Sequence, residues 1–297
     1  MKKVLLIYNR ISGTGFIRKN LSVVVEEFVK NDCEVTVYPI FPKKGIVTEK
    51  IIAEQSDRFD LIVICGGDGT LNYAINALMK HNIQKPIGYI PSGTTNDFSK
   101  NIENATTIEG YCHNIIQGTP FQYDIGRLNN RYFNYVAAFG AFTKPSYTTS
   151  QSAKNTLGYG AYVLNSIGTF GESLNYHRHI RFSHEGIEEV GDYIFGSITN
   201  SLTMGGMKLQ FLQDAKLNDG LFEVLLVSAP KDPADFANII GNIATGNFDN
   251  QLIRSFQTKE LEITCAEKIE WTIDGEDGGC YQANHFQVID KAITIIR

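Results

Sequence analysis

The stretch VICGGDGTLNYAINAL, residues 63–78, decides how the first part of this chain folds. It opens as a short apolar run and ends with apolar residues at intervals of three and four, the spacing of an amphipathic helix. Between these two patterns lie three glycines and Asp68. Glycine lets backbone amides approach a ligand closely, and the positive end of a following helix favours an anion. The stretch therefore predicts a phosphate-binding turn between a buried strand and a helix.

The same alternation runs through the first 125 residues. Strands are predicted at Val4–Tyr8, Glu34–Tyr38, Leu61–Cys65 and Ile87–Ile90, and helices at Ile17–Asn31, Val47–Gln55 and Leu71–His81. This order predicts a Rossmann-like α/β nucleotide-binding domain with a largely parallel sheet. Ligands of such domains bind beyond the C-terminal ends of the strands.

The pattern changes after residue 125 to short apolar runs separated by turn residues. Strands are predicted at Gly126–Ala138, Tyr176–Ser183, Asp192–Thr199, Leu221–Val227, Leu261–Thr264, Ile269–Ile273 and Phe286–Ile289, and helices at Tyr159–Phe170 and Pro233–Ala244. This pattern predicts a second, mainly antiparallel β-sandwich domain over residues 126–297. We expect it to pack closely against the domain of residues 1–125 around a shared cleft.

Composition narrows the class of protein. Of 297 residues, 43% are hydrophobic and 20% are charged, which is typical of a folded chain. The formal net charge of −5 gives no reason to expect nucleic-acid binding. The five cysteines form no CxxC pair, so reduced thiols and a cytoplasmic location are expected. No apolar run is long enough to predict a membrane-spanning helix.

Two further polar turns follow predicted strands. NRISG spans residues 9–13 after the first strand, and PSGTTNDF spans residues 91–98 after the fourth. A parallel sheet would place both turns at the same edge as residues 66–70, which would bring carboxylates and hydroxyls together there. On its own, Asp68 could simply cap the helix that follows it. Three such turns at one edge favour a ligand site instead.

With these motifs, and with YDIG at 123–126, KLNDGL at 216–221 and IDGE at 273–276, the chain resembles a known family. This is the catalytic domain shared by diacylglycerol kinases, sphingosine kinases and soluble bacterial lipid kinases. The resemblance covers essentially the whole chain. The ordered set of motifs is more specific than GGDGT, which NAD kinases and phosphofructokinases also carry. It implies an ATP- and Mg²⁺-dependent lipid kinase that converts diacylglycerol to phosphatidic acid.

The resemblance also implies roles for individual residues. Those implied to bind ATP are Asn9, Arg10, Ile11, Ser12, Gly13, Gly66, Gly67, Asp68, Gly69, Thr70, Leu71, Asn72 and Thr94. Asp68, Asp97 and Asp124 match acidic positions that organise Mg²⁺ through waters near the transferred phosphate. Glu276 matches the general base that takes the proton of the lipid hydroxyl.

A second metal site is implied by the segment after residue 215. Lys216, Asp219 and Leu221 match a structural Mg²⁺ site, the first and third through backbone carbonyls. From the residues alone, both the Asp219 segment and IDGE also fit plain turns, because Asp-Gly is a strong turn signal. The implied roles agree with the chemistry, since phosphoryl transfer needs neutralised phosphate charge and a protonated alcohol gains from a positioned base.

The chain departs from the family pattern at two places. Arg10 stands where the family has proline before Ser-Gly. The second departure is the stretch around Phe41, residues 40–47. The family commonly has a threonine and Gly-Asp-Ala there, and this stretch has neither, so no threonine contact with the nucleotide is predicted.

Other functions stay open from the sequence. The acceptor could be another lipid, such as phosphatidylglycerol, sphingosine or undecaprenol, or it could be NAD. A non-catalytic nucleotide-binding regulator is a further alternative, although the intact set of Asp68, Asp97, Asp124 and Glu276 argues against it. A lipid kinase must meet its substrate at a bilayer, so transient peripheral membrane contact is expected. The family likeness is compatible with a homodimer.

Overall fold

The computed structural model describes residues 1–13, 15–94, 96–102, 105–140, 177–203 and 212–297. The strands are β1 (Lys2–Tyr8), β2 (Cys33–Pro39), β3 (Leu61–Gly66), β4 (Ile87–Pro91), β5 (Pro120–Leu128), β6 (Arg131–Phe133), β7 (Val136–Gly140), β8 (Arg178–His184), β9 (Ile187–Thr199), β10 (Phe222–Ser228), β11 (Ile253–Thr258), β12 (Glu260–Ile273) and β13 (Glu276–Ile296). The α-helices are α1 (Phe16–Lys30), α2 (Thr48–Gln55), α3 (Asp68–Lys80), α4 (Ile108–Gln117) and α7 (Pro233–Thr245). Short 3-10 helices are η1 (Pro42–Lys44), η2 (Ser56–Arg58) and η3 (Phe98–Asn101). No helix within these ranges is long and apolar enough to cross a membrane.

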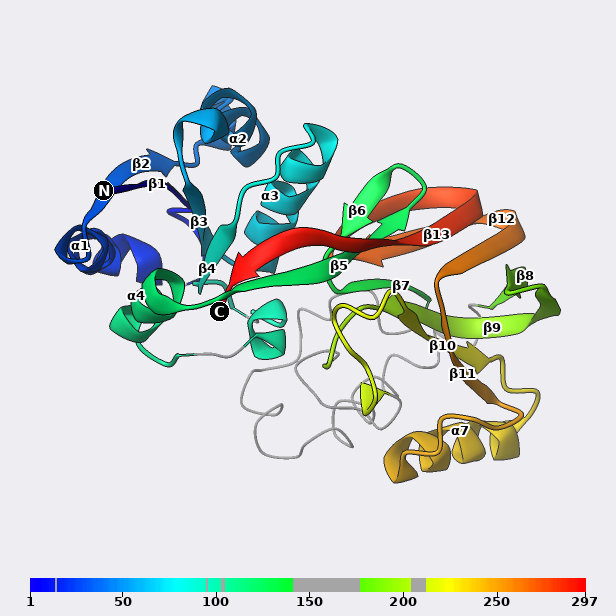
Figure 1. The fold of residues 1–297 in the computed structure, drawn as a ribbon. Helices are drawn as coiled ribbons and strands as arrows, with labels where there is room; N and C mark the ends of the chain where they lie inside the picture. The colour runs from blue at the N-terminus through cyan, green and yellow to red at the C-terminus, as the bar shows by residue number, and fades with distance from the viewer. Residues whose placement is uncertain (14, 95, 103–104, 141–176, 204–211) are drawn as a thin grey trace.

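The first part of the chain forms the predicted parallel sheet. Its strands lie in the order β2-β1-β3-β4, all parallel. Because side chains alternate between the faces of a strand, Leu5 and Ile7 pack with α2 and α3, whereas Val4 and Leu6 pack with α1 and α4. Figure 1 shows these two helix pairs on opposite sides of the strands. The apolar runs of the strands are thus buried on both faces, as α/β layering requires.

The second part is an antiparallel sheet. Its strands follow the order β11-β10-β9-β7-β12-β13, with β8 paired to β9 and β12. Its core centres on Trp271, whose ring centroid lies 5.1 Å from that of Phe139 and 4.8 Å from that of Phe286. The indole N–H donates to Asn284 Oδ1 over 2.6 Å, so the buried donor is paired. Trp271 is therefore a core residue, and the prediction of an antiparallel sheet is confirmed.

Several predicted element boundaries were wrong. The single strand expected over 126–138 is divided between β5, β6 and β7, because Asn129 adopts a φ of 52° and turns the chain. The strands expected at 261–264 and 269–273 are one strand, β12, with a shift in register between Thr264 and Ile269. Helix α4 and strand β11 were not predicted. The helix expected at 159–170 lies outside the described residues.

The long strand β13 connects the two parts. It begins in a hairpin with β12, and its far end pairs in parallel with β4 through Ile295 and Ile87. Ile293 and Ile295 belong to the same core as α2 and α3. A division of the chain at residue 125 therefore does not separate two sheets, because β13 joins the described strands into one continuous sheet.

Candidate active site

A cavity of about 610 Å³ opens beyond the C-terminal ends of β1, β3 and β4. All three predicted turns contribute to it, through Asn9, Ser12, Gly13, Gly67, Gly69, Thr70, Gly93 and Thr94. The first and second turns are joined directly, since Asn9 Nδ2 donates to Thr70 Oγ1 over 3.1 Å. Glu276, from the second part of the chain, lines the same cavity. The structure therefore brings together the turns that the sequence placed at one edge.

Two glycines let the second and third turns touch. A Cβ atom on Gly93 would lie 2.6 Å from the Cα of Gly67, and one on Gly67 would lie 3.1 Å from the Cα of Gly93. The backbone N–H of Ser92 donates to the carbonyl of Gly66 over 2.8 Å. Side chains at either glycine would force the turns apart. The floor of the cavity is consequently built from backbone, which suits an anion that accepts hydrogen bonds from N–H groups.

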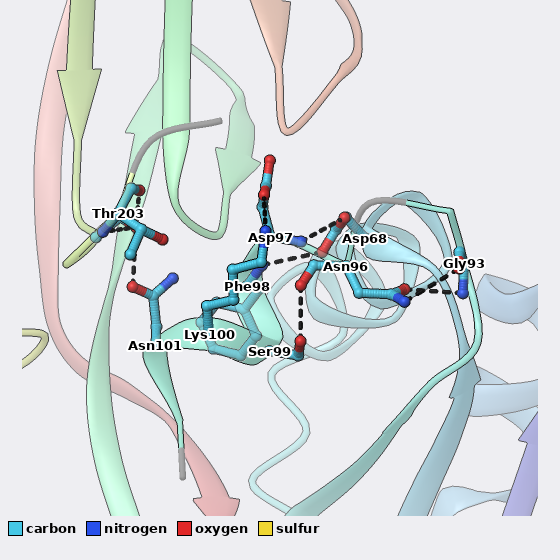
Figure 2. Close-up of polar contacts among 10 residues, drawn as sticks. Asp68, Gly93, Asn96, Asp97, Phe98, Ser99, Lys100, Asn101 and Thr203 are labelled. Atoms are coloured by element: carbon cyan, nitrogen blue, oxygen red, sulfur yellow. Dashed lines mark hydrogen bonds and ion pairs between the residues drawn. The ribbon is translucent and has the colours of Figure 1, made fainter. Parts of the chain in front are cut away.

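Asp68 reaches across to the third turn. It is the first residue of α3, and its carboxylate accepts hydrogen bonds from the backbone N–H groups of Asp97, over 3.0 Å, and Phe98, over 3.1 Å (Figure 2). Burial raises the pKa of Asp68, while the two N–H donors oppose the change. Its side chain thus fixes the position of Asp97, and neither of these two aspartates lines the cavity.

Asp97 directly precedes η3 and is 7% exposed. Its Oδ1 atom lies 3.0 Å from the ammonium nitrogen of Lys100 (Figure 2). The same short helix is held from the second part of the chain, because Asn101 Oδ1 accepts hydrogen bonds from the backbone N–H of Leu202 and the hydroxyl of Ser201. The carboxylate of Asp97 is therefore held firmly next to Asp68.

Glu276 lies directly against the start of α3. It is an exposed residue at the first position of β13. A Cβ atom built on Gly69 would collide with Glu276 Oε1, so a side chain there would displace this carboxylate. A residue far away in the sequence is thus positioned over the predicted phosphate-binding turn.

Asp124 has different neighbours. It is fully buried, and its carboxylate accepts hydrogen bonds from the backbone N–H groups of Gly220 and Lys291, both over 2.7 Å. Burial raises the pKa of Asp124, and the two donors oppose the change. No contact joins Asp124 to Asp68 or Asp97 within the described ranges, so its role near the transferred phosphate stays a prediction.

The predicted structural metal site lies beside Asp124. The backbone N–H of Asp124 donates to the carbonyl of Leu217 over 2.8 Å, within the segment that contains Lys216. Asp219 Oδ1 accepts a hydrogen bond from the backbone N–H of Leu221 over 3.2 Å. These contacts fold the segment around Asp219 into a turn that leaves one carboxylate oxygen and backbone carbonyls as candidate ligands for a hard cation.

Four residues predicted to bind ATP have side chains directed elsewhere. Leu71 is fully buried in the core shared with α2, and the side chain of Asn72 is also buried. Ile11 is 73% exposed and does not line the cavity. Arg10 lies over the ring of Phe41 at 5.3 Å, so the two departures from the family pattern contact each other.

One wall of the cavity was not predicted. Ile40, Pro42 and Val47 form an apolar surface, and the exposed aromatic ring of Tyr73 lines the cavity from α3. Thr48 also lines it, although no threonine contact was expected. The sequence signal was weak, because Ile40, Pro42 and Val47 flank the charged Lys43 and Lys44. Tyr73 could have been found from its exposed helical position three residues after Thr70.

The residues present fit a nucleoside triphosphate and a divalent cation. The cavity offers a glycine floor at the N-terminus of α3 for phosphates and an apolar wall for a base. No three His, Cys, Asp or Glu side chains among the described residues are grouped closely enough to bind a metal ion. A cation beside Asp68 and Asp97 would therefore take its other ligands from phosphate or water, as Mg²⁺ commonly does.

Comparison with known sequences decides the family. Residues 3–128 match the model of the diacylglycerol kinase catalytic domain, and residues 137–297 match that of the YegS C-terminal NAD kinase beta sandwich-like domain. The chain belongs to the diacylglycerol kinase family. This lipid kinase therefore pairs a catalytic domain with a sandwich-like one, and membership of a kinase family implies ATP as phosphate donor and, typically, a divalent metal.

Sequence and structure comparisons also match this chain to other proteins over nearly its full length. The lipid kinase is 29% identical to a diacylglycerol kinase of Staphylococcus carnosus over 95% of this chain and 91% of the relative. It is 28% identical to a diacylglycerol kinase of Staphylococcus aureus over 99% of this chain and 92% of that protein. A crystal structure of a diacylglycerol kinase from Bacillus anthracis has the same fold, with a TM-score of 0.74 and 20% identity over 99% of this chain and 96% of that one.

Proposed function

We propose that this lipid kinase transfers the γ-phosphate of ATP to the free hydroxyl of diacylglycerol, giving phosphatidic acid. The observation that carries the proposal is the contact between Glu276 and Gly69, which places a carboxylate over the phosphate-binding turn. The names of the staphylococcal relatives support the choice of lipid. The metal in this proposal is Mg²⁺.

ATP binds along the length of the cavity. Its phosphates lie on the floor formed by Gly67 and Gly93, where backbone N–H groups and the N-terminus of α3 stabilise negative charge. Its base lies against the apolar wall opposite, with the ring of Tyr73 available for stacking. This arrangement directs the terminal phosphate towards Glu276.

Asp68 and Asp97 are the residues that hold Mg²⁺ at this site, and Asp124 would complete the acidic set. When bound, Mg²⁺ neutralises phosphate charge during transfer. Lys100, which already pairs with Asp97, adds a mobile positive charge beside the phosphates. A second Mg²⁺ in the turn around Asp219 would stabilise that part of the structure.

Glu276 acts as the general base. The lipid hydroxyl donates its proton to the Glu276 carboxylate while its oxygen bonds to the γ-phosphorus. The bond from that phosphorus to the β–γ bridging oxygen breaks, and ADP leaves with the electron pair. Because Glu276 is exposed, it returns the proton to solvent.

The lipid stays in its bilayer, so the enzyme must approach it. We propose that the domain of residues 126–297 binds the lipid during a transient contact between the cytoplasmic protein and the membrane surface. A homodimer is part of the same proposal.

Transfer of labelled γ-phosphate into a panel of lipids in mixed micelles tests these assignments. The expected product is labelled phosphatidic acid, formed by the wild type and by the control variant Glu270→Gln, which removes an exposed carboxylate from β12. Glu276→Gln is expected to bind ATP but to transfer at least roughly 100-fold more slowly, because the base is lost. Label in another lipid would change the acceptor and keep the mechanism, whereas label in NAD alone would refute the lipid proposal.

A further inference from the structure

A buried carboxylate lies two residues before Glu276. Asp274 directly follows β12, in the turn of its hairpin with β13, and is only 2% exposed. Its φ angle is 49° and that of Gly275 is 82°, so both residues of the turn adopt the left-handed conformation. Such a pair forms a tight hairpin turn, and Glu276 follows it directly. The direction of Glu276 therefore depends on how firmly this turn is held.

Four hydrogen bonds hold the Asp274 side chain. Oδ1 accepts from the backbone N–H groups of Tyr135 and Val136, both over 3.0 Å. Oδ2 accepts from the backbone N–H of Asn134 and from Asn72 Nδ2, both over 2.6 Å. Every partner is a donor, which matches a carboxylate that can only accept.

The charge state at neutral pH agrees with this arrangement. Burial raises the pKa of Asp274 to about 6, and the four donors oppose the rise. The group is consequently ionised at pH 7 and above. Three of its bonds are local to the second part of the chain. The fourth, to Asn72, crosses to the nucleotide-binding part.

The hydrogen bond from Asn72 to Asp274 matters because of the position of Asn72 in the site. This residue lies in α3 three residues after Gly69, against which the Glu276 carboxylate packs. Helix α3 thus begins in the phosphate-binding turn, and one turn later its Asn72 side chain holds the turn that contains Asp274. A second anchor follows one turn later, where Asn76 donates to the carbonyl of Tyr132 over 2.9 Å and accepts from its N–H over 3.1 Å. Asn76 Nδ2 also donates to Asn72 Oδ1 over 3.1 Å, but no hydrogen bond joins Asn76 to Asp274.

We propose that Asp274 is a positioning residue, which through its hydrogen bond to Asn72 fixes Glu276 over the phosphate-binding turn. The inference rests on the proposed function of Glu276. The new element is that a tie, the hydrogen bond between Asp274 and Asn72 of α3, aligns Glu276, in addition to the packing of the first and second parts of the chain. Misplacement of a reacting group by about 1 Å can lower a rate on the order of 100-fold, so losing the tie lowers turnover without removing any group that touches substrate.

The two asparagines of α3 provide a matched test. Asn72→Ala removes the tie to Asp274 together with the hydrogen bonds of Asn72 to Tyr132 and Asn76. Asn76→Ala removes the bonds to Tyr132 and Asn72 but keeps both partners of the tie. We expect Asn72→Ala to lower kcat roughly 10- to 100-fold while the KM for ATP changes less than about twofold. Asn76→Ala is expected to keep kcat within about twofold of the wild type. Thermal unfolding of both variants establishes that rates are compared on folded protein.

A second variant and a second readout keep the test decisive. Asp274→Asn has the same shape but presents an NH₂ group to donors, so it is expected to lower kcat at least as much as Asn72→Ala. Hydrogen exchange of the amides of residues 275–279 is expected to be faster in Asn72→Ala than in Asn76→Ala.

Equal losses of kcat in the two asparagine variants would overturn the proposal, because Asn76→Ala keeps the residues of the tie and the bond to Asp274 would then add nothing to kcat. A change confined to the KM for ATP would also overturn it and make Asn72 a nucleotide ligand. If the wild type transfers phosphate to no lipid, the proposed function fails. The exchange measurement still decides whether Asn72 fixes the hairpin, because it requires no turnover.

Discussion

Replacing Glu223 by glutamine should stabilise the protein at high pH but not at low pH. Glu223 lies on β10 and is 2% exposed. Oε1 accepts a hydrogen bond from Gln257 Nε2 over 3.1 Å, whereas Oε2 has no hydrogen-bond partner among the described residues. Burial of this poorly paired carboxyl raises its pKa from 4.5 to about 7. The folded state therefore holds the proton more tightly than the unfolded state does.

The size of the effect follows from that difference. Between 4.5 and about 7, at about 1.4 kcal/mol per pH unit, ionisation costs the folded state about 3 kcal/mol. Below pH 4.5 both states are protonated and the cost is absent. It grows as the pH rises and is complete above pH 7. Glutamine stays neutral throughout. Its new NH₂ group needs a hydrogen-bond partner, however, and this lowers the stability of the variant by about 1 kcal/mol. The net gain at pH 8 is then about 2 kcal/mol.

Urea unfolding followed by circular dichroism at pH 5 and pH 8 measures this gain. Glu262→Gln is the control, because it makes the same chemical change at an exposed position on β12. The expected result is a stabilisation of Glu223→Gln that grows between the two pH values, with no such growth in the control. Equal effects at both pH values, or destabilisation at pH 8, would refute the argument that Glu223 is a buried and poorly paired charge.

Three further changes test the site. Gly69→Ala places a methyl group against the Glu276 carboxylate and should lower turnover at least roughly 10-fold with the circular dichroism spectrum retained, whereas Gly241→Ala, which has open space around it, should change neither. Gly93→Ala forces the turn away from Gly67 and should lower stability by about 1–3 kcal/mol and weaken ATP binding by calorimetry; unchanged affinity would show that the floor is not the phosphate site. Chelation of divalent metal should stop transfer and added Mg²⁺ should restore it, so transfer that persists in a chelator would exclude a metal requirement.

Local patterns predicted the nucleotide-binding part well. The glycine step at 66–69 and the apolar run before it mark the strand, the turn and the helix without any distant information. Convergence of three turns also follows from the sequence, because parallel strands end at one edge of the sheet. Glu276 could be assigned only through the family likeness, since its own neighbourhood also fits a plain hairpin turn.

Pairings between distant segments were not accessible in this way. Nothing near Asn72 indicates that its amide bonds to Asp274, because the two residues are separated by most of the chain. The helical pattern of α3 did contain the information that Leu71 faces the core, and its implied contact with ATP rests on the family likeness alone. The cavity wall near Val47 was missed because charge dominates the local sequence around it.

The course of β13 has a consequence for biosynthesis. Its last residues pair with β4 and β5, and Arg297 and Thr119 exchange backbone hydrogen bonds of 2.9 and 3.1 Å. On the ribosome, β4 emerges about two hundred residues before Ile295, its pairing partner. Until then the nascent sheet keeps an open edge of unpaired N–H and C=O groups, a feature that invites association with other chains. The parallel sheet of β1 to β4 therefore cannot complete its edge until β13 has been made, although its own strands are made first.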